Sequence, residues 1–161
     1  MPYQFRDSLA ADFRELWRID QQCFAPGIAY SQRELAWYMA MRGAFTIVAE
    51  QESSDTVGKS EDDSRSIVGF LVGQKHARGM GHVVTIDVLP QARRSGVGSQ
   101  LMNECERRLS SMGCKSVYLE MAVDNAPALR FYKRHGYSIL KTIPRYYNGE
   151  LDAFLLGKDL T

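Results

Sequence analysis

Two adjacent arginines and two glycines stand where a strand gives way to a helix, in the segment LPQARRSGVGSQLM (89–102). The preceding residues HVVTIDV (82–88) are rich in β-branched types, which favour strands. Such a turn can bind an anion, because the first N–H groups of a helix lack an intrahelical partner and glycine lets a phosphate approach the backbone. The alternative is a plain strand-to-helix turn in which Arg93 and Arg94 are solvated. Apolar residues follow in steps of three and four, the spacing of one helix face: Val97, Leu101, Met102, Cys105, Leu109 and Met112.

A second group of polar residues falls in YLEMAVDNAPALRFYKRHGY (118–137). Glu120 lies near the end of a predicted strand, where α/β sheets usually place ligands. Asn125 lies at a helix start, and Tyr132, about two helical turns later, lies on roughly the same side of that helix. Each residue also has a structural alternative: a surface carboxylate, a helix cap and a packed ring.

The rest of the sequence predicts the elements that would position these groups. Ser31 and Glu34 have the spacing of a capping box, which marks the start of a helix. Helices are predicted over the apolar pattern from Leu9 to Ile19, from Ser31 to about Arg42, over 97–112 and over 125–135. Strands are predicted at 2–6, 44–50, 66–76, 82–88, 115–121, 137–143 and 152–160, with loops at 23–30 and 144–151. Strands that alternate with helices and end in a hairpin favour a mixed sheet covered by helices.

One long segment between two of these strands has a different composition. Residues 51–66 are polar, acidic and almost without large apolar groups, so they cannot bury a core of their own. We expect a mobile, solvated hairpin loop there; an acidic contact surface is the alternative. The chain of 161 residues suits a single domain over 1–161 with a sizeable core.

Composition and charge exclude several classes of protein. The chain is 45% apolar and 24% charged, as globular proteins are, and its net charge of +1 implies no general affinity for nucleic acid or membranes. Cys23, Cys105 and Cys114 show neither metal-ligand spacing nor a disulfide framework, so no metal site is predicted. The first residues lack the apolar core of a secretory signal, and no stretch reaches the roughly 20 apolar residues of a membrane span. We therefore expect a cytoplasmic protein.

Taken together, the two groups of residues resemble the motifs of the GNAT superfamily of acyl-CoA-dependent N-acetyltransferases. R-R-S-G-V-G (93–98) matches its pyrophosphate motif, Arg/Gln-x-x-Gly-x-Gly/Ala. N-A-P-A-L-R-F-Y-K-R-H-G-Y (125–137) matches its motif Asn-x-x-Ala-x-x-Phe/Leu-Tyr-x-x-x-Gly-Phe/Tyr. Within the superfamily the chain is most similar to the ribosomal-protein-alanine and related protein N-terminal acetyltransferases, whose Glu, Asn and Tyr have the spacing of Glu120, Asn125 and Tyr132.

The resemblance implies the GNAT fold, a mixed and mostly antiparallel central sheet of about seven strands flanked by about four helices. It also implies acetyl-CoA as the acyl donor, Glu120 as the general base and Tyr132 as the general acid for the departing thiolate. The donor's pyrophosphate would bind main-chain N–H groups of the turn, and its pantetheine arm would pair with the preceding strand end. The implied donor-binding residues are Ile86, Asp87, Val88, Arg93, Arg94, Ser95, Gly96, Val97, Gly98, Ser99 and Asn125.

The acceptor that the resemblance implies is the N-terminal α-amine of a protein or peptide, such as a ribosomal protein, bound by a monomer or weak dimer. CFAPGIAYS (23–31) resembles the substrate loop of this group and contains Tyr30. RYYNGEL (145–151) resembles its ending, whose paired tyrosines are Tyr146 and Tyr147; one of the two is expected to pack against the sheet. The alternatives are a lysine side chain, a small amine such as a polyamine or an antibiotic, and a non-catalytic acyl-CoA-binding module.

His82 begins the strand that leads to the glycine-rich turn. Regular alternation places its side chain on the opposite face of that strand from Asp87. We expect a histidine that faces solvent; a contribution to deprotonation of the amine through water is the alternative.

Overall fold

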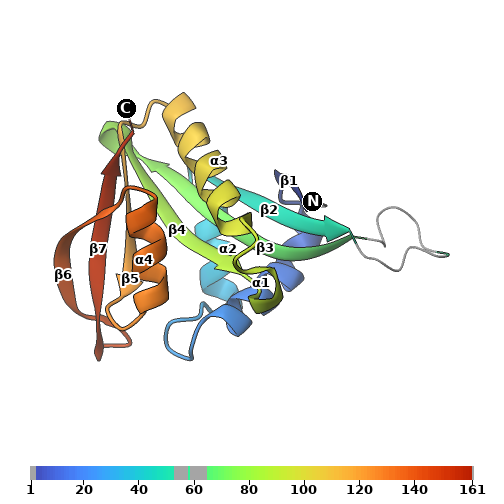
Figure 1. Cartoon of the computed structure of the whole chain (residues 1–161), viewed down its shortest axis with the longest axis horizontal. Coiled ribbons are helices and arrows are strands. Elements are labelled where there is room, and N and C mark those ends of the chain that lie inside the picture. Colours follow the sequence, from blue (N-terminus) through green and yellow to red (C-terminus); the bar gives the residue numbers. More distant parts are fainter. Residues whose placement is uncertain (1–2, 53–57, 59–64, 161) are drawn as a thin grey trace.

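The computed structural model describes residues 3–52, 58 and 65–160, which form one seven-stranded sheet and four α-helices (Figure 1). The strands are β1 (Tyr3–Asp7), β2 (Ala44–Glu52), β3 (Arg65–His76), β4 (Met80–Val88), β5 (Ser116–Ala122), β6 (Ser138–Tyr147) and β7 (Leu151–Asp159). The helices are α1 (Phe13–Cys23), α2 (Gln32–Ala40), α3 (Val97–Ser111) and α4 (Ala126–Arg134). The strand order is β1-β2-β3-β4-β5-β7-β6, and every neighbouring pair except β4 and β5 is antiparallel. The predicted mixed, mostly antiparallel sheet is therefore confirmed.

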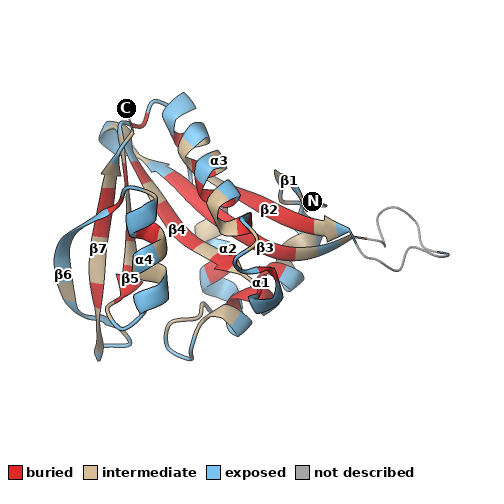
Figure 2. Cartoon of the chain, in the orientation of Figure 1, coloured by how far each residue is buried: buried red, intermediate tan, exposed pale blue. Residues whose placement is uncertain are grey.

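Different helices cover the two faces of the sheet (Figure 1). On one face, Leu16 and Ile19 of α1 pack with Val48 and Phe70. Ile47, the neighbour of Val48, enters the core on the other face, so the central strands are buried on both sides, as Figure 2 shows. That second core contains five of the six residues of the predicted apolar stripe of α3: Val97, Leu101, Met102, Cys105 and Leu109. The sixth, Met112, is the C-cap of the helix and lies outside this core.

β4 and β5 run parallel but are paired only at their beginnings. The ladder joins Met80–His82 to Ser116–Tyr118, after which the two strands diverge (Figure 1). A β-bulge accompanies the divergence, because consecutive residues of β3 face Thr85 and Val83 and leave Val84 as the extra residue of β4. A bulge bends its strand and re-aims the side chains that follow it.

The hairpin at the end of the sheet is longer than predicted. A loop was expected over 144–151, but β6 continues to Tyr147 and only a short turn precedes β7. Pro144 lacks an N–H donor and Arg145 has φ +53°, so β6 passes through an irregularity instead of ending. The Arg145 N–H group donates to the carboxylate of Asp152 at 2.9 Å, which replaces a ladder hydrogen bond.

Two other boundaries also differ from the prediction. β2 extends to Glu52 and β3 begins at Arg65, so both ends of the segment 51–66 belong to the sheet. The expected mobile loop falls on 53–57 and 59–64, which lie outside the described residues. No described helix has the length and apolar composition needed to span a membrane.

α2 begins as predicted and ends early. The Ser31 hydroxyl accepts a hydrogen bond from the Glu34 N–H at 3.1 Å, and the Glu34 carboxylate accepts one from the Ser31 N–H at 3.0 Å. The capping box is therefore confirmed. The helix stops at Ala40, before Arg42, because Met41 has an extended backbone.

Candidate active site

A cleft of about 730 Å³ opens in the gap between β4 and β5. Small-molecule sites in proteins typically occupy roughly 300–1,000 Å³. Its walls come from the diverging strand ends, the glycine-rich turn, the start of α4 and the loop between α1 and α2. The predicted site residues that line it are Tyr30, Ile86, Val88, Arg93, Arg94, Gly96, Gly98, Ser99, Glu120, Asn125, Tyr132 and Tyr147.

Three of the predicted donor-binding residues do not line the cleft. The Asp87 carboxyl group is fully buried on the α1 side of β4, beside Asp20. Val97 is buried in the core beneath α3. The Ser95 hydroxyl donates to the carbonyl oxygen of Ala92 and so closes the turn on itself. These three residues can face a ligand only through their main-chain groups.

The turn before α3 contains two residues in the left-handed backbone region. Arg94 has φ +61°, and Gly96, the N-cap of α3, has φ +89°. An added Cβ at Gly98 would lie 3.3 Å from the ring of Phe131, so this glycine lets α4 approach the first turn of α3. The cleft therefore meets a helix N-terminus with little side-chain cover, where unpaired N–H groups and the helix dipole favour an anion. The Arg93 Nε group donates to the carbonyl of Val88 at 2.9 Å and ties this turn to the end of β4.

His82 contacts the predicted base. Its Nε2 atom lies 2.8 Å from Oε2 of Glu120, and the two side chains are 13% and 16% exposed. The ring also stacks on Tyr118, with centroids 4.4 Å apart and an interplanar angle of 10°. The expectation that His82 faces solvent is wrong. The parallel pairing of His82 with Tyr118 is the reason, because it puts His82 on the face that Glu120 shares two residues later.

The β-bulge also reverses the expected relation between His82 and Asp87. Val83 and Ile86 both belong to the core beneath α3, although regular alternation would send them to opposite faces. The extra residue Val84 shifts the alternation between them. His82 and Asp87 therefore lie on the same face of β4, the face covered by α1 and α2.

Glu120 and Tyr132 reach the cleft from opposite faces of the sheet. Glu120 alternates with Leu119 and Met121, which enter the core beneath α3, so its carboxylate lies on the other side. Tyr132 belongs to that core, and its ring packs edge-on against Phe131 at 5.4 Å. Burial raises the pKa of the Tyr132 phenol, which therefore keeps its proton at neutral pH. The cleft passes through the sheet between the two groups.

Asn125 is the N-cap of α4. Its Oδ1 atom accepts a hydrogen bond from the Ala128 N–H at 3.2 Å. The structural alternative for this residue is confirmed, and the side chain lines the cleft as well.

Two of the three tyrosines predicted to bind the acceptor, Tyr30 and Tyr147, line the cleft. The Tyr30 hydroxyl donates to the carbonyl of Val84 at 3.3 Å. Tyr147 lines the cleft, and burial raises the pKa of its phenol. Tyr146 lies edge-on to Tyr147, with centroids 4.9 Å apart, and remains 46% exposed. Of the pair, Tyr147 is therefore the one that faces a ligand in the cleft.

The model of the acetyltransferase (GNAT) family matches residues 10–137. The chain belongs to this family. It is 38% identical over 81 residues to an N-alpha-acetyltransferase of Sulfurisphaera tokodaii. The matched stretch covers 50% of this chain and 48% of that protein. It is 31% identical over 107 residues to the N-terminal acetyltransferase B complex catalytic subunit NAA20 of Arabidopsis thaliana, with 63% of this chain and 61% of that protein covered. Both matches span less than two thirds of the relative's length.

A solved structure extends the similarity over the whole GNAT chain. Ard1 from Thermoplasma volcanium superimposes with a TM-score of 0.82 at 27% identity. The superposition covers 100% of this chain and 99% of that one. The fold predicted from two short motifs is therefore confirmed over the part of the chain that the structure describes.

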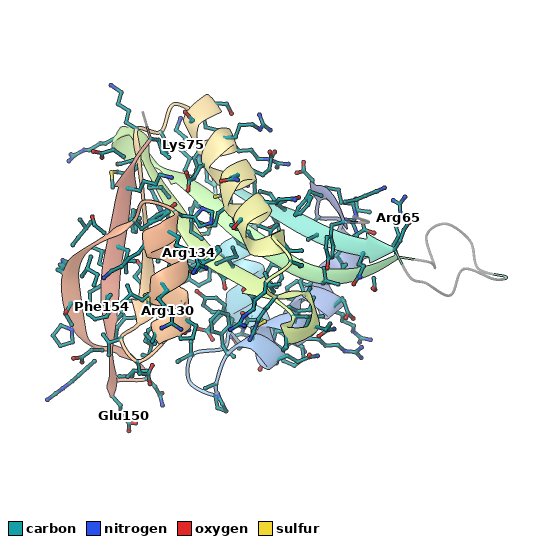
Figure 3. The ribbon with its side chains drawn as sticks, in the orientation of Figure 1. Arg65, Lys75, Arg130, Arg134, Glu150 and Phe154 are labelled. Carbon is teal, nitrogen blue, oxygen red and sulfur yellow. The ribbon has the colours of Figure 1, made fainter. Side chains whose placement is uncertain are left out.

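The GNAT domain brings two further cations to the cleft that the motifs did not single out. Arg130 and Arg134 line it from α4, where both are labelled in Figure 3. They are four residues apart and so lie on one face of the helix, a spacing that is visible in the sequence. Arg93 and Arg94 line the same cleft, and these four residues are together called the arginine cluster.

Proposed function

We propose that this GNAT-family chain transfers an acetyl group from acetyl-CoA to the N-terminal α-amine of a protein or peptide. The observation that carries the proposal is that Glu120 and Tyr132 line one cleft from opposite faces of the sheet. A carboxylate and a phenol placed in this way suit a reaction in which one partner loses a proton and another gains one.

The diphosphate of the donor suits the turn on the α3 and α4 side. Residues 93–99 supply main-chain N–H groups, and the arginine cluster supplies charge that persists at physiological pH. Asn125 lies at the start of α4 and can hydrogen-bond the donor through its amide N–H, since its Oδ1 is used by the cap. These groups fit the donor's phosphates and require no metal ion.

The pantetheine arm of the donor suits the free edge of β4. The carbonyl of Asp87 points toward β3, because it lies 2.7 Å from where a Cβ at Gly69 would be. Strand alternation then turns the main-chain groups of Ile86 and Val88 toward β5. In the described part of the chain, the β4–β5 ladder ends at His82. An amide-containing arm can therefore lie in the gap as an added strand.

The acceptor's proton is removed on the other side of the sheet. An α-amine has a pKa of about 7.7–8.0, so much of it arrives as ammonium. Glu120, held by His82, accepts a proton from it. Burial raises the pKa of Tyr132, so its phenol keeps its proton and donates a hydrogen bond to the leaving sulfur. The second proton, which the attacking nitrogen loses as the amide forms, protonates the thiolate. Bound acetyl-CoA would supply the thioester carbon that the free amine attacks.

The mouth of the cleft favours a peptide as acceptor. Phe24, Ile28, Tyr30 and Tyr147 give it apolar walls with hydroxyl groups at the edge. Aromatic residues of this kind contact a chain through ring faces and hydrogen-bond its amides. The names of the curated relatives, N-alpha-acetyltransferase and NAA20, support the same class of acceptor.

The test is a thiol-release assay with the purified chain, acetyl-CoA and a panel of peptides that differ in their first residues. We expect turnover with peptides, and its loss in Glu120→Gln and Tyr132→Phe while CoA binding by calorimetry is retained. Unchanged rates in both variants would refute the assigned roles. Turnover with polyamines alone would identify a small-amine acetyltransferase, and CoA binding without any turnover would identify a binding module.

A further inference from the structure

Two aspartates meet in the interior beside the cleft. Asp20 of α1 and Asp87 of β4 are both fully buried, at 0% exposure, and their carboxyl groups are close enough to influence each other's pKa. Aspartate is almost never fully buried without a partner. Two carboxylates in contact and away from water cannot both stay ionised, because each charge disfavours the other.

The hydrogen bonds of the pair leave room for one proton. Asp20 Oδ2 accepts from the Tyr30 N–H at 2.7 Å, and Asp87 Oδ1 accepts from the Thr85 hydroxyl at 2.6 Å. The other two oxygens, Asp20 Oδ1 and Asp87 Oδ2, have no donor among the described residues. A proton on one of the two carboxyl groups, donated to the other, satisfies both oxygens at once.

The pair connects the two halves of the candidate site. Through Asp20 it holds the backbone of Tyr30, whose carbonyl also accepts from Trp17 Nε1 at 3.1 Å and from Gln21 Nε2 at 2.7 Å. The Tyr30 side chain lines the acceptor mouth. Asp87 lies in β4 between Ile86 and Val88, which line the donor side. The pair therefore links the acceptor loop to the donor strand.

We propose that Asp20 and Asp87 share one proton, and that this pair acts as a positioning device that sets the loop at Tyr30 for the acceptor. The inference rests on the proposed function for its kinetic consequence only. The shared proton holds the two carboxyl groups together and leaves the pair with one negative charge instead of two. Loss of the proton leaves two facing carboxylates, which repel and release the loop.

Several titratable and polar groups surround the pair. Burial is the main reason why the pKa of each carboxyl group is raised. Glu34 of α2 adds to the rise at Asp20, whereas Arg93 in the turn opposes it at Asp87. Cys23 of α1 and Tyr132 of α4 also lie within electrostatic range of Asp87, and burial and this charge raise the pKa of both, that of Cys23 to about 11. Neither group supplies a competing charge at neutral pH.

Asparagine substitutions separate this role from simple packing. In Asp87→Asn the amide oxygen still accepts from Thr85 and the NH₂ group donates to Asp20 without any titrating proton. Asp20→Asn is the mirror case, with its oxygen on the Tyr30 N–H. In the double variant both oxygens keep these donors, so two NH₂ groups face each other and the contact is lost. All three changes conserve volume.

The experiment measures acceptor KM, kcat and CoA affinity for the wild type and the three variants across pH. The acceptor KM of the wild type is expected to rise at alkaline pH, and that of each single variant is not. Titration of the peptide amine affects all the proteins equally, so it cannot cause this difference. The double variant is expected to raise acceptor KM roughly tenfold, the effect of losing a contact worth about 1.4 kcal/mol, with CoA affinity unchanged. The proposal would be overturned if the difference in acceptor KM between the wild type and the single variants did not change with pH.

A second measurement does not depend on acetylation. Infrared spectroscopy of the wild type should show a protonated carboxyl band at neutral pH that is absent in either single variant. Hydrogen exchange in residues 24–31 should increase in the double variant alone. If the band is absent from the wild type, the shared proton is refuted. If the band is present and no peptide is acetylated, the proposed function fails and the shared proton does not.

Discussion

His82 Nε2 lies 2.8 Å from Glu120 Oε2, in the part of the sheet where β4 and β5 are about to separate. The last rung of their parallel ladder pairs His82 with Tyr118, two residues before Glu120. The contact is therefore fixed by strand pairing and by the stack of His82 on Tyr118. His82 therefore places a hydrogen-bond donor beside the proposed base. This contact limits the directions in which the Glu120 carboxylate can turn.

His82→Phe is expected to lower kcat with little change in the affinity for CoA. Phenylalanine keeps a ring on Tyr118 but removes the hydrogen bond to Glu120, and hydrogen bonds to charged groups contribute about 1.5–3 kcal/mol, or roughly 10- to 150-fold. Steady-state kinetics and calorimetry measure the two effects. Tyr118→Phe is the matched control, because it keeps the stack and the His82–Glu120 contact. Wild-type turnover in His82→Phe would contradict the role given to this contact.

Gly96→Ala is expected to weaken CoA binding and to destabilise the fold, and Gly113→Ala only to destabilise it. The two glycines have φ +89° and +91°, and an added Cβ at either meets no atom within 4 Å. Alanine in this backbone region therefore costs about 1–2 kcal/mol at both. Of these two glycines, Gly96 lines the cleft and Gly113 does not. Urea denaturation should show equal losses of stability, and calorimetry with CoA should separate the pair. Equal CoA affinities would show that the turn does not hold the donor.

The sequence could predict where most of the residues that line the cleft lie along the chain, but not which face of the sheet each one occupies. The glycine-rich turn, the cap at Asn125 and the helix that carries Tyr132 depend on local spacing, which one sequence shows. The contact of His82 with Glu120 depends on which strands pair and on a bulge at Val84, which reverses the alternation without any local signal. The contact of Asp20 with Asp87 arises from the packing of a helix on a sheet. Contacts between distant segments of this kind cannot be inferred from periodicity alone.

Arg134→Ala is expected to weaken CoA binding about 1.4- to fivefold at low salt, since an exposed charge pair contributes about 0.2–1 kcal/mol. The loss should shrink at high ionic strength, where such charges are screened. Lys133→Ala is the control, because this exposed cation lies on the same helix but does not line the cleft. Calorimetry at two salt concentrations measures both. Equal losses in the two variants would mean that the net charge of α4 matters and the arginine cluster does not.

Asp87→Asn is expected to become progressively more stable than the wild type as pH rises above the ordinary aspartate pKa. In the folded chain burial raises the pKa of Asp87, whereas in the unfolded chain it is about 3.9, so the folded state binds more protons between these values. Wild-type stability therefore falls as pH increases through that window, and the variant lacks the fall. Asp12→Asn should show the opposite sign, because its hydrogen bond from Arg6 lowers the pKa of Asp12 and its contribution is lost as pH falls. Urea denaturation of the wild type and Asp87→Asn from about pH 4 to 8, and of the wild type and Asp12→Asn below about pH 4, tests the two directions. If the free energy of unfolding depended on pH in the same way in the wild type and in Asp87→Asn, a protonated pair would be contradicted.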